Sequence, residues 1–107
     1  MRIDKVRTDS IVYSVKFKYD FSREKDALLK QTRGIGFSDV IEATKKGKLL
    51  DDIEHFNKKK YPNQKILIIK VEKKIYAVPY VIDNKKKREF LKTIYPSRKL
   101  KKMYDNE

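Results

Sequence analysis

Apolar residues alternate with polar ones near the start of the chain and then change to a helical spacing. From Ile11 to Lys18 every second side chain is apolar, which is the period of a half-buried strand. Asp20 stands where a helix N-cap belongs, because its carboxylate can accept from free backbone amides. The pattern predicts a polar lead-in over 1–10, a first strand, and a helix from about Phe21 to Thr32.

Two glycines close to each other interrupt this helical pattern. After Gly34 and Gly36, apolar residues return at helical spacing from Phe37 to Thr44. Gly47 follows and can end a helix in the left-handed conformation, with lysines in the last turn to suit the helix dipole. We therefore expect a second helix that is short and amphipathic.

The middle of the chain is rich in residues that favour strands. Leu49–Glu54 predicts a weak strand because two aspartates interrupt it, and Lys65–Val71 and Ile75–Ile82 predict a hairpin. His55–Gln64, between the first two of these strands, is a polar loop. Pro79 has no N–H for a sheet ladder, so its strand is expected at a sheet edge or with a bulge.

The last quarter of the chain is a strand pattern that runs into a basic segment. After a turn at Asp83–Lys87, Arg88–Tyr95 predicts the last strand, and the basic tail at 99–107 predicts only a short terminal helix. The apolar stripe of that helix would consist of Leu100, Met103 and Tyr104. A strand, two helices and then three or four antiparallel strands predict an α+β fold with the helices on one sheet face.

Composition restricts the class of protein. The 107 residues suffice for a single domain over 1–107, and a hydrophobic content of 39% predicts a folded chain although 40% of residues are charged. The formal net charge of +13 favours a polyanionic partner, because each neutralised phosphate releases condensed counterions. RNA, DNA and an acidic protein all satisfy this requirement.

Several chemistries are excluded or disfavoured. The absence of cysteine excludes disulfides, zinc ribbons and thiol catalysis. The longest apolar run, Ile66–Ile69, is too short to span a bilayer, so we expect a cytoplasmic protein without a membrane partner. Asp51, Asp52, Glu54 and His55 form the one group that resembles a metal-ligand set, and the neighbouring lysines favour a solvated acidic edge instead. We expect neither a metal nor a cofactor.

Metal-free RNA cleavage fits the remaining residue types, because the 2′-hydroxyl of the substrate is itself the nucleophile. The protein need supply only a base, an acid for the departing 5′ oxygen, and cations for the phosphorane. Arg98 is the best candidate for charge stabilisation, since its guanidinium can bind two phosphate oxygens at once. Lys92 alternates with Phe90 and Ile94, so it is expected among core-facing residues, where partial desolvation would favour acid or base catalysis. Other candidates for proton transfer are His55, Tyr76 and Tyr95.

Two stretches of the chain resemble the BrnT-like toxins, with a similarity over about residues 17 to 104. Tyr19–Lys25 followed by Arg33–Val40 is similar to that family's aromatic-Asp-Pro-x-Lys start, helix and Lys-His-Gly-Val-x-Phe motif. Lys92–Lys99 is similar to its arginine-bearing strand ending in Ile-Ser-Ala-Arg. The matching positions are Asp20, Lys25, Arg33, Gly34, Ser97 and Arg98. The sequence departs from the family pattern at Phe21 for proline, at Thr32-Arg33 for Lys-His, and at Lys92 for arginine.

The resemblance implies a RelE-like ribonuclease fold and a toxin of a type II toxin–antitoxin system that inhibits translation and growth. Such a toxin is a metal-independent endoribonuclease acting on mRNA, free or on the ribosome. Its partner would be a ribbon-helix-helix antitoxin, in a hetero-oligomer that binds its own operator DNA. The resemblance and the residue chemistry together give the catalytic candidates Arg98, Lys92, His55, Tyr76 and Tyr95. The RNA-binding candidates are Arg33, Ser97, Lys99, Lys25, Lys59 and Lys60.

Two alternatives stay open at this point. Composition alone supports a non-catalytic basic module that binds nucleic acid. The loss of the motif histidine at Thr32-Arg33 also fits an attenuated toxin that mainly binds its antitoxin.

Overall fold

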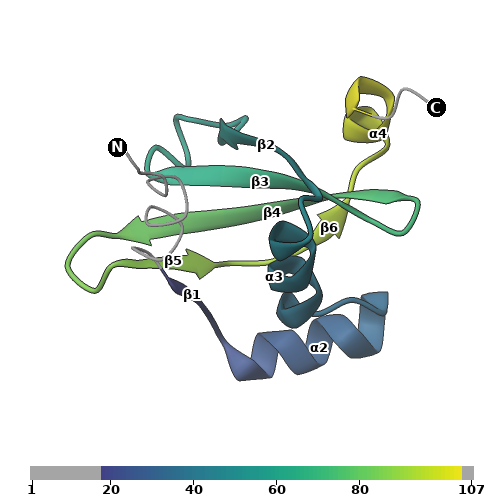
Figure 1. Cartoon of the computed structure of the whole chain (residues 1–107). Helices are drawn as coiled ribbons and strands as arrows, with labels where there is room; N and C mark the ends of the chain where they lie inside the picture. Colours follow the sequence, from purple (N-terminus) through teal and green to yellow (C-terminus); the bar gives the residue numbers. More distant parts are fainter. Residues whose placement is uncertain (1–17, 105–107) are drawn as a thin grey trace, which may run out of the picture.

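The computed structural model describes residues 18–104 (Figure 1). Its elements, in chain order, are β1 (Lys18–Phe21), α2 (Arg23–Arg33), α3 (Phe37–Lys45), β2 (Leu49–Glu54), β3 (Gln64–Val71), β4 (Lys74–Asp83), β5 (Arg88–Leu91), β6 (Tyr95–Pro96) and α4 (Arg98–Tyr104). The predicted α+β class is confirmed. The lead-in over 1–10 and the strand predicted for 11–18 fall outside the described residues, except that Lys18 begins β1.

The sheet is mixed rather than wholly antiparallel. Its six strands have the order β1-β5-β4-β3-β2, with β6 paired to β4. β1 runs parallel to β5, and all other pairs among the described strands are antiparallel. The predicted strands Leu49–Glu54, Lys65–Val71 and Ile75–Ile82 are confirmed to within a residue at each end. The expected count of three or four antiparallel strands misses the parallel β1–β5 pair and the short β6.

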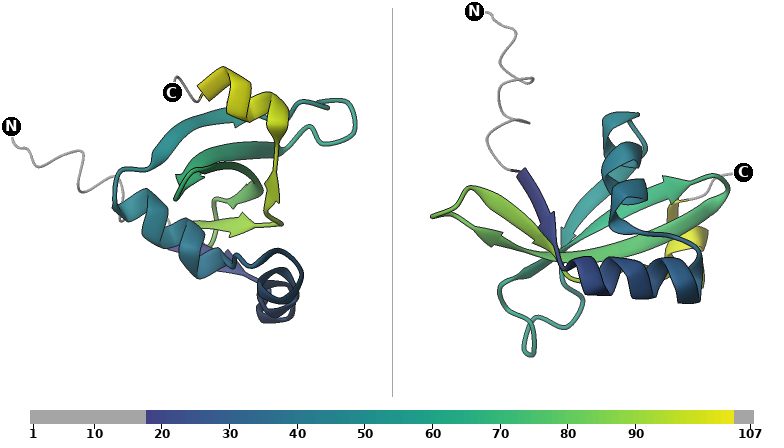
Figure 2. Two further views of the ribbon diagram at one scale, coloured as in Figure 1. Left: turned by 90° about the vertical axis from the view of Figure 1, so that its right-hand side faces the viewer. Right: turned by 90° about the horizontal axis from the view of Figure 1, so that it is seen from below.

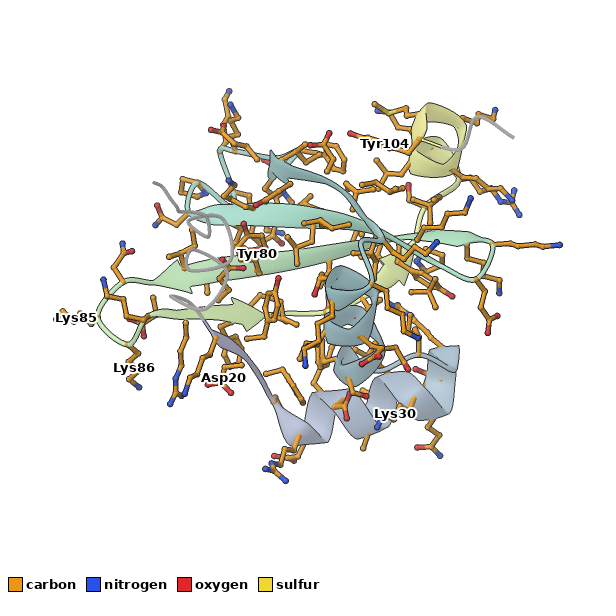
Figure 3. All side chains as sticks on the ribbon, viewed as in Figure 1. Asp20, Lys30, Tyr80, Lys85, Lys86 and Tyr104 are labelled. Atoms are coloured by element: carbon orange, nitrogen blue, oxygen red, sulfur yellow. The ribbon has the colours of Figure 1, made fainter. Side chains whose placement is uncertain are left out.

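The start of α2 differs from the prediction. Its N-cap is Ser22, whose Oγ accepts from the Lys25 N–H at 3.1 Å. Asp20, predicted as the cap, lies in β1, where its carboxylate accepts from the Phe21 N–H and pairs with Arg88 of β5 at 2.9 Å (Figure 3). Pairing with β5 keeps Asp20 and Phe21 extended, so the helix begins two residues later than expected.

The two glycines separate α2 from α3 as predicted. Gly34 ends α2 in the left-handed conformation, with φ at 71°. A Cβ on Gly36 would lie 2.6 Å from Asp26 Oδ1, the atom that accepts from the Phe37 N–H at 2.7 Å. This close approach joins the two helices and leaves no room for a side chain at Gly36. Gly47 follows α3 with φ at 78°, in agreement with the predicted helix end.

Helices cover both faces of the sheet. On one side, which we call the first face, α2 and α3 pack Leu29, Phe37 and Val40 against a core that includes Leu67 and Val78. On the opposite side, the second face, α4 covers a smaller cluster (Figures 1 and 2). The buried members of this cluster are Ile66, Ile68, Ile75, Ala77 and Leu100. Burial on both faces explains the uninterrupted buried run in β3. The prediction of helices on one face therefore holds for α2 and α3 and is wrong for α4.

Pro79 lies inside the sheet, so the predicted edge position is wrong, but the pairing beside it is irregular, as the alternative of a bulge requires: two residues of β4 lie opposite three of the next segment. β4 pairs with β3 on one side and with both β5 and β6 on the other. β5 ends at Leu91 and β6 begins at Tyr95, so Pro79 faces the gap between them. There its carbonyl accepts from the Lys92 N–H at 2.8 Å, and no partner requires an N–H in return. The strand predicted over Arg88–Tyr95 is thus two short strands.

The short terminal helix is confirmed as α4. Leu100 is 1% exposed, and the Tyr104 hydroxyl donates to Asp51 of β2 at 2.7 Å (Figure 3). Met103 is 58% exposed, so it does not belong to the predicted apolar stripe. None of the helices within residues 18–104 is long and apolar enough to cross a membrane.

Candidate nucleic-acid interface

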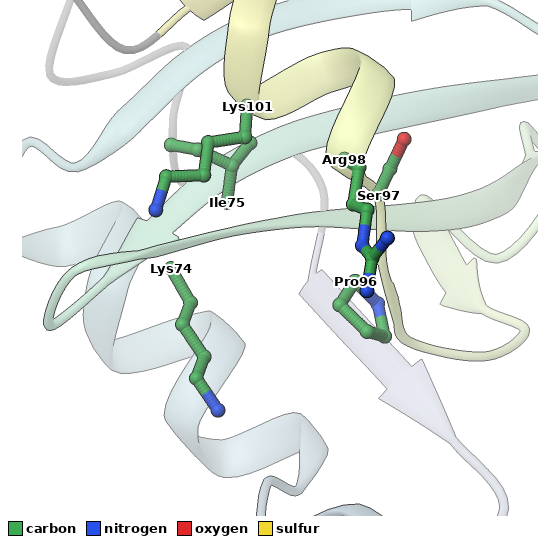
Figure 4. Close-up of a pocket in the computed structure, with 6 residues that line it drawn as sticks. All are labelled: Lys74, Ile75, Pro96, Ser97, Arg98 and Lys101. Carbon is green, nitrogen blue, oxygen red and sulfur yellow. The ribbon is translucent and has the colours of Figure 1, made fainter.

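A surface pocket lies where the chain leaves β6 and enters α4 (Figure 4). Its volume is about 270 Å³, and its lining comes from the β3–β4 hairpin and the beginning of α4. The lining residues are Lys74, Ile75, Pro96, Ser97, Arg98 and Lys101. The structure therefore brings Ser97 and Arg98, both predicted site residues, to the same pocket.

Backbone pairing and one helix cap fix this region. The Ser97 N–H donates to the Ile75 carbonyl at 3.4 Å, which continues the pairing of β6 with β4. Ser97 Oγ accepts from the Leu100 N–H at 3.2 Å, the contact of an N-cap. Since Leu100 is buried on the second face, the cap and the core hold the first turn of α4 together. The Ser97 hydroxyl, predicted to bind RNA, thus caps α4. Arg98 follows it at an exposed position.

Two cations extend from α4 along this pocket. In Figure 4 the Arg98 guanidinium lies beside Pro96, and the Lys101 side chain runs along Ile75. Lys74 contributes its stem to the lining, but its ammonium points away from α4. A guanidinium offers two parallel donors to phosphate oxygens, and an ammonium offers a mobile point charge. In Figure 4 the charged ends of Arg98 and Lys101 point in different directions, and most of the lining surface of the pocket is apolar.

Lys92 does not occupy the position that its sequence pattern predicts. It is exposed, and its Nζ lies 5.4 Å from the centre of the Phe90 ring. The core-facing residue of β5 is Leu91 rather than Phe90, so alternation places Lys92 beside Phe90 on the side that faces away from the core of the first face. The expected desolvated lysine is therefore wrong, and Lys92 does not line the pocket.

The two candidate tyrosines lie on opposite faces. Tyr76 is 7% exposed and belongs to the core under α2 and α3, so its predicted catalytic role is not supported. Tyr95 is half-buried on the second face, and burial raises the pKa of its phenol. Tyr95 consequently stays protonated near neutral pH, one residue before Pro96 of the pocket.

His55 lies in the loop between β2 and β3 with Lys59 and Lys60. Its ring is 4.5 Å from that of Tyr61, centre to centre, and its Nδ1 accepts from the Asn57 N–H. None of these loop residues lines the Arg98 pocket. The structure thus separates the predicted histidine acid or base from the predicted charge stabiliser.

Lys99 connects the loop with α4. Its Nζ lies 6.0 Å from the centre of the Phe56 ring, which is within reach of a cation–π attraction. Lys99 and Arg98 are adjacent at the start of α4, so the predicted RNA-binding lysine lies between the pocket and the loop.

Arg33 and Lys25 lie on α2, on the first face. The Arg33 Nη1 donates to the Ile94 carbonyl and thereby ties the end of α2 to the segment between β5 and β6. Lys25 is half-buried in the first turn of α2. Neither residue lines the Arg98 pocket, so the predicted RNA-binding residues do not form one cluster.

The acidic edge of β2 has its own partners. The bond from Tyr104 lowers the pKa of Asp51, and Lys58 lowers the pKa of Glu54. The Tyr80 hydroxyl lies 2.8 Å from each oxygen of Asp52, which also pairs with Lys65 at 3.7 Å. Across residues 18–104, no three His, Asp or Glu side chains gather in a way that could hold a metal ion.

A second group of ionisable side chains surrounds Tyr80 on the first face (Figure 3). Burial, and next the bond to Asp52, raises the pKa of Tyr80 well above its usual value. Burial also raises the pKa of Tyr19 and of Glu89. These groups are acids and phenols that carry no positive charge, so they are unsuited to phosphate. Sequence reasoning missed the group, because its members come from β1, β2, β4 and β5.

Sequence reasoning also missed Lys101, Lys74 and Phe56. Both lysines stand in runs of basic residues, where nothing in the sequence distinguishes one from its neighbours. Phe56 in a polar, lysine-rich loop was the signal that could have been used, because an apolar ring there has no obvious core to join.

Comparison with protein-family models, with curated proteins and with solved structures gives no match.

Proposed function

We propose that the chain is an RNA-cleaving toxin that binds the scissile phosphate in the Arg98 pocket and needs no metal. The observation that carries the proposal is that Arg98 and Lys101 both line one pocket at a strand exit. The guanidinium would bind the phosphorane oxygens, and the Lys101 ammonium would complete the charge stabilisation. An ammonium can also donate a proton to the departing 5′ oxygen.

The toxin assignment and a RelE-like fold rest on the resemblance to BrnT-like toxins. The α+β arrangement, with two helices preceding the main antiparallel strands and Arg98 following the last one, is compatible with that resemblance. The expected partner is a ribbon-helix-helix antitoxin encoded beside the toxin. Induced expression should arrest growth and translation, and co-expression of the neighbouring reading frame should relieve the arrest.

A direct cleavage assay tests the enzyme. Purified protein is added to a cell-free translation system containing chelator, and RNA integrity is followed. We expect cleavage, and we expect Arg98→Ala to lower its rate roughly 10²- to 10³-fold, as removal of one charge-stabilising donor does elsewhere. Arg23→Ala, at an exposed arginine of α2, is the matched control and should cleave normally. RNA that stays intact at high protein concentration would refute an enzyme.

A non-catalytic RNA-binding module is the second candidate. The position of His55, Tyr76, Lys92 and Tyr95 outside the pocket favours it, because four of the five predicted catalytic residues do not line the pocket of Arg98. Such a module would bind RNA with an affinity that falls steeply as salt rises, and it would form no product at any salt concentration.

A further inference from the structure

Phe56 is an aromatic side chain on the surface of a basic loop. It is 55% exposed, and it is the one aromatic residue among the large apolar side chains exposed within residues 18–104. It follows β2 in a loop that contains three consecutive lysines, Lys58 to Lys60. Single exposed apolar side chains are common on protein surfaces, so exposure alone assigns no role to Phe56, and its surroundings decide.

The loop holds Phe56 in place from both sides. His55 Nδ1 accepts from the Asn57 N–H at 3.0 Å, and Asn57 Oδ1 accepts from the Lys60 N–H at 3.1 Å. The His55 ring packs against Tyr61, and the His55 backbone N–H donates to the Gln64 carbonyl at 3.1 Å. Because the residues flanking Phe56 are already ordered, binding a ligand to its ring has a low entropic cost.

One cation lies near the ring. Lys99 Nζ is 6.0 Å from the ring centre, and Lys99 is bonded in sequence to Arg98 of the pocket. The flat face of a nucleobase stacks on an aromatic ring, while the phosphates on either side of it attract ammonium groups. An apolar protein partner would instead favour a larger apolar patch with fewer lysines.

We propose that Phe56 stacks on an unpaired base of single-stranded RNA whose backbone phosphate occupies the Arg98 pocket. This inference rests on the function proposed above and adds the substrate class: the RNA must be single-stranded. In a duplex the bases already stack on one another, and none is free to lie on Phe56. Lys99, between the two contacts, would follow the backbone.

RNA-binding measurements on matched variants test the stacking contact. Fluorescence anisotropy is measured with a labelled single-stranded RNA and with the same strand in a duplex, both made uncleavable by 2′-O-methyl groups. We expect Phe56→Ala to bind the single strand roughly 5- to 150-fold more weakly, with an unchanged salt slope. Leu28→Ala removes an apolar side chain of similar exposure from α2, and its affinity should stay within about twofold of wild type.

A tryptophan at the same position reports stacking directly, because the natural chain contains none. Phe56→Trp should retain single-strand affinity, and its fluorescence should be quenched by single-stranded RNA but not by duplex. Leu28→Trp should show no quenching with either.

The outcomes separate this inference from the proposed function. Wild-type affinity in Phe56→Ala, together with loss of binding in Arg98→Ala, overturns the stacking contact and leaves the phosphate pocket intact. Equal binding of duplex and single strand also overturns it. Failure of the wild-type protein to bind any RNA overturns both proposals.

Discussion

The two faces of the sheet are covered in different ways. On the first face α2 and α3 enclose a large apolar core that includes Phe37 and Val40, both fully buried. On the second face α4, a helix of seven residues, packs mainly through Leu100 and the Tyr104–Asp51 bond. The cations of the candidate site belong to the second face, on its small helix.

This difference indicates a division between stability and binding. A large core fixes the sheet, and a small helix docked on the other side presents Arg98, Lys99 and Lys101. Since few contacts hold α4, changes there should affect binding more than global stability. Changes in the core of the first face should affect global stability more than binding.

The largest effect is expected on the first face. Phe37→Ala should lower the free energy of unfolding by about 3–5 kcal/mol, because it removes a fully buried ring from the centre of the core. Urea denaturation measures this loss. RNA affinity of the folded protein should stay within about twofold of wild type, since Phe37 and the α4 residue Leu100 belong to separate core clusters on opposite faces of the sheet. A large loss of affinity in the folded variant would argue against separate roles for the two faces.

A smaller stability effect with a larger binding effect is expected on the second face. Leu100→Ala removes the buried anchor of α4, and we expect a loss of about 2 kcal/mol, the low end for buried leucines, because α4 can undock locally. RNA affinity should fall with it, since the cations lose their fixed positions. Met103→Ala, at an exposed site on the same helix, should change neither quantity. Normal RNA binding by Leu100→Ala would show that docking of α4 is not needed.

The sequence is sufficient to predict most of the elements. Two runs of strand-favouring residues separated by a short turn identify the β3–β4 hairpin, and Gly34, Gly36 and Gly47 mark the helix ends, because these signals are local. The parallel pairing of β1 is a contact between distant segments, and it keeps Asp20 from capping a helix. No local pattern encodes that contact.

The candidate site is predicted only in part for the same reason. Arg98 and Ser97 follow a strand signal and are found together. Lys92 was misplaced because the apolar pattern does not distinguish Phe90 from Leu91 as the core-facing residue, and the structure buries Leu91. The lysines near Arg98 are the ones that the hairpin and α4 bring to the same pocket. The sequence alone does not single them out among 28 basic residues.

The smallest expected effect on stability concerns Glu89, a residue of the first face that does not stabilise the fold at neutral pH. Glu89 of β5 lies on this face, two residues before the buried Leu91, and burial, then the nearby charge of Asp52, raises its pKa. A carboxyl whose pKa is higher in the folded state favours folding below its unfolded pKa of about 4.3, and this contribution is lost as pH rises through the folded value. Glu89→Gln should therefore be more stable than wild type at pH 7.

Solvent screens this half-buried group, so the gain at pH 7 should be only roughly 0.5 kcal/mol. The two proteins should become equally stable below about pH 4, where the glutamate is protonated in both states. Thermal unfolding between these pH values measures the difference, and Glu24→Gln on exposed α2 controls for the loss of one negative charge. Parallel stability curves for Glu89→Gln and wild type would contradict the raised pKa. Glu89 would then not lower the stability of the first face at neutral pH. The contrast between a first face that stabilises the fold and a second face that binds would be sharper than the structure indicates.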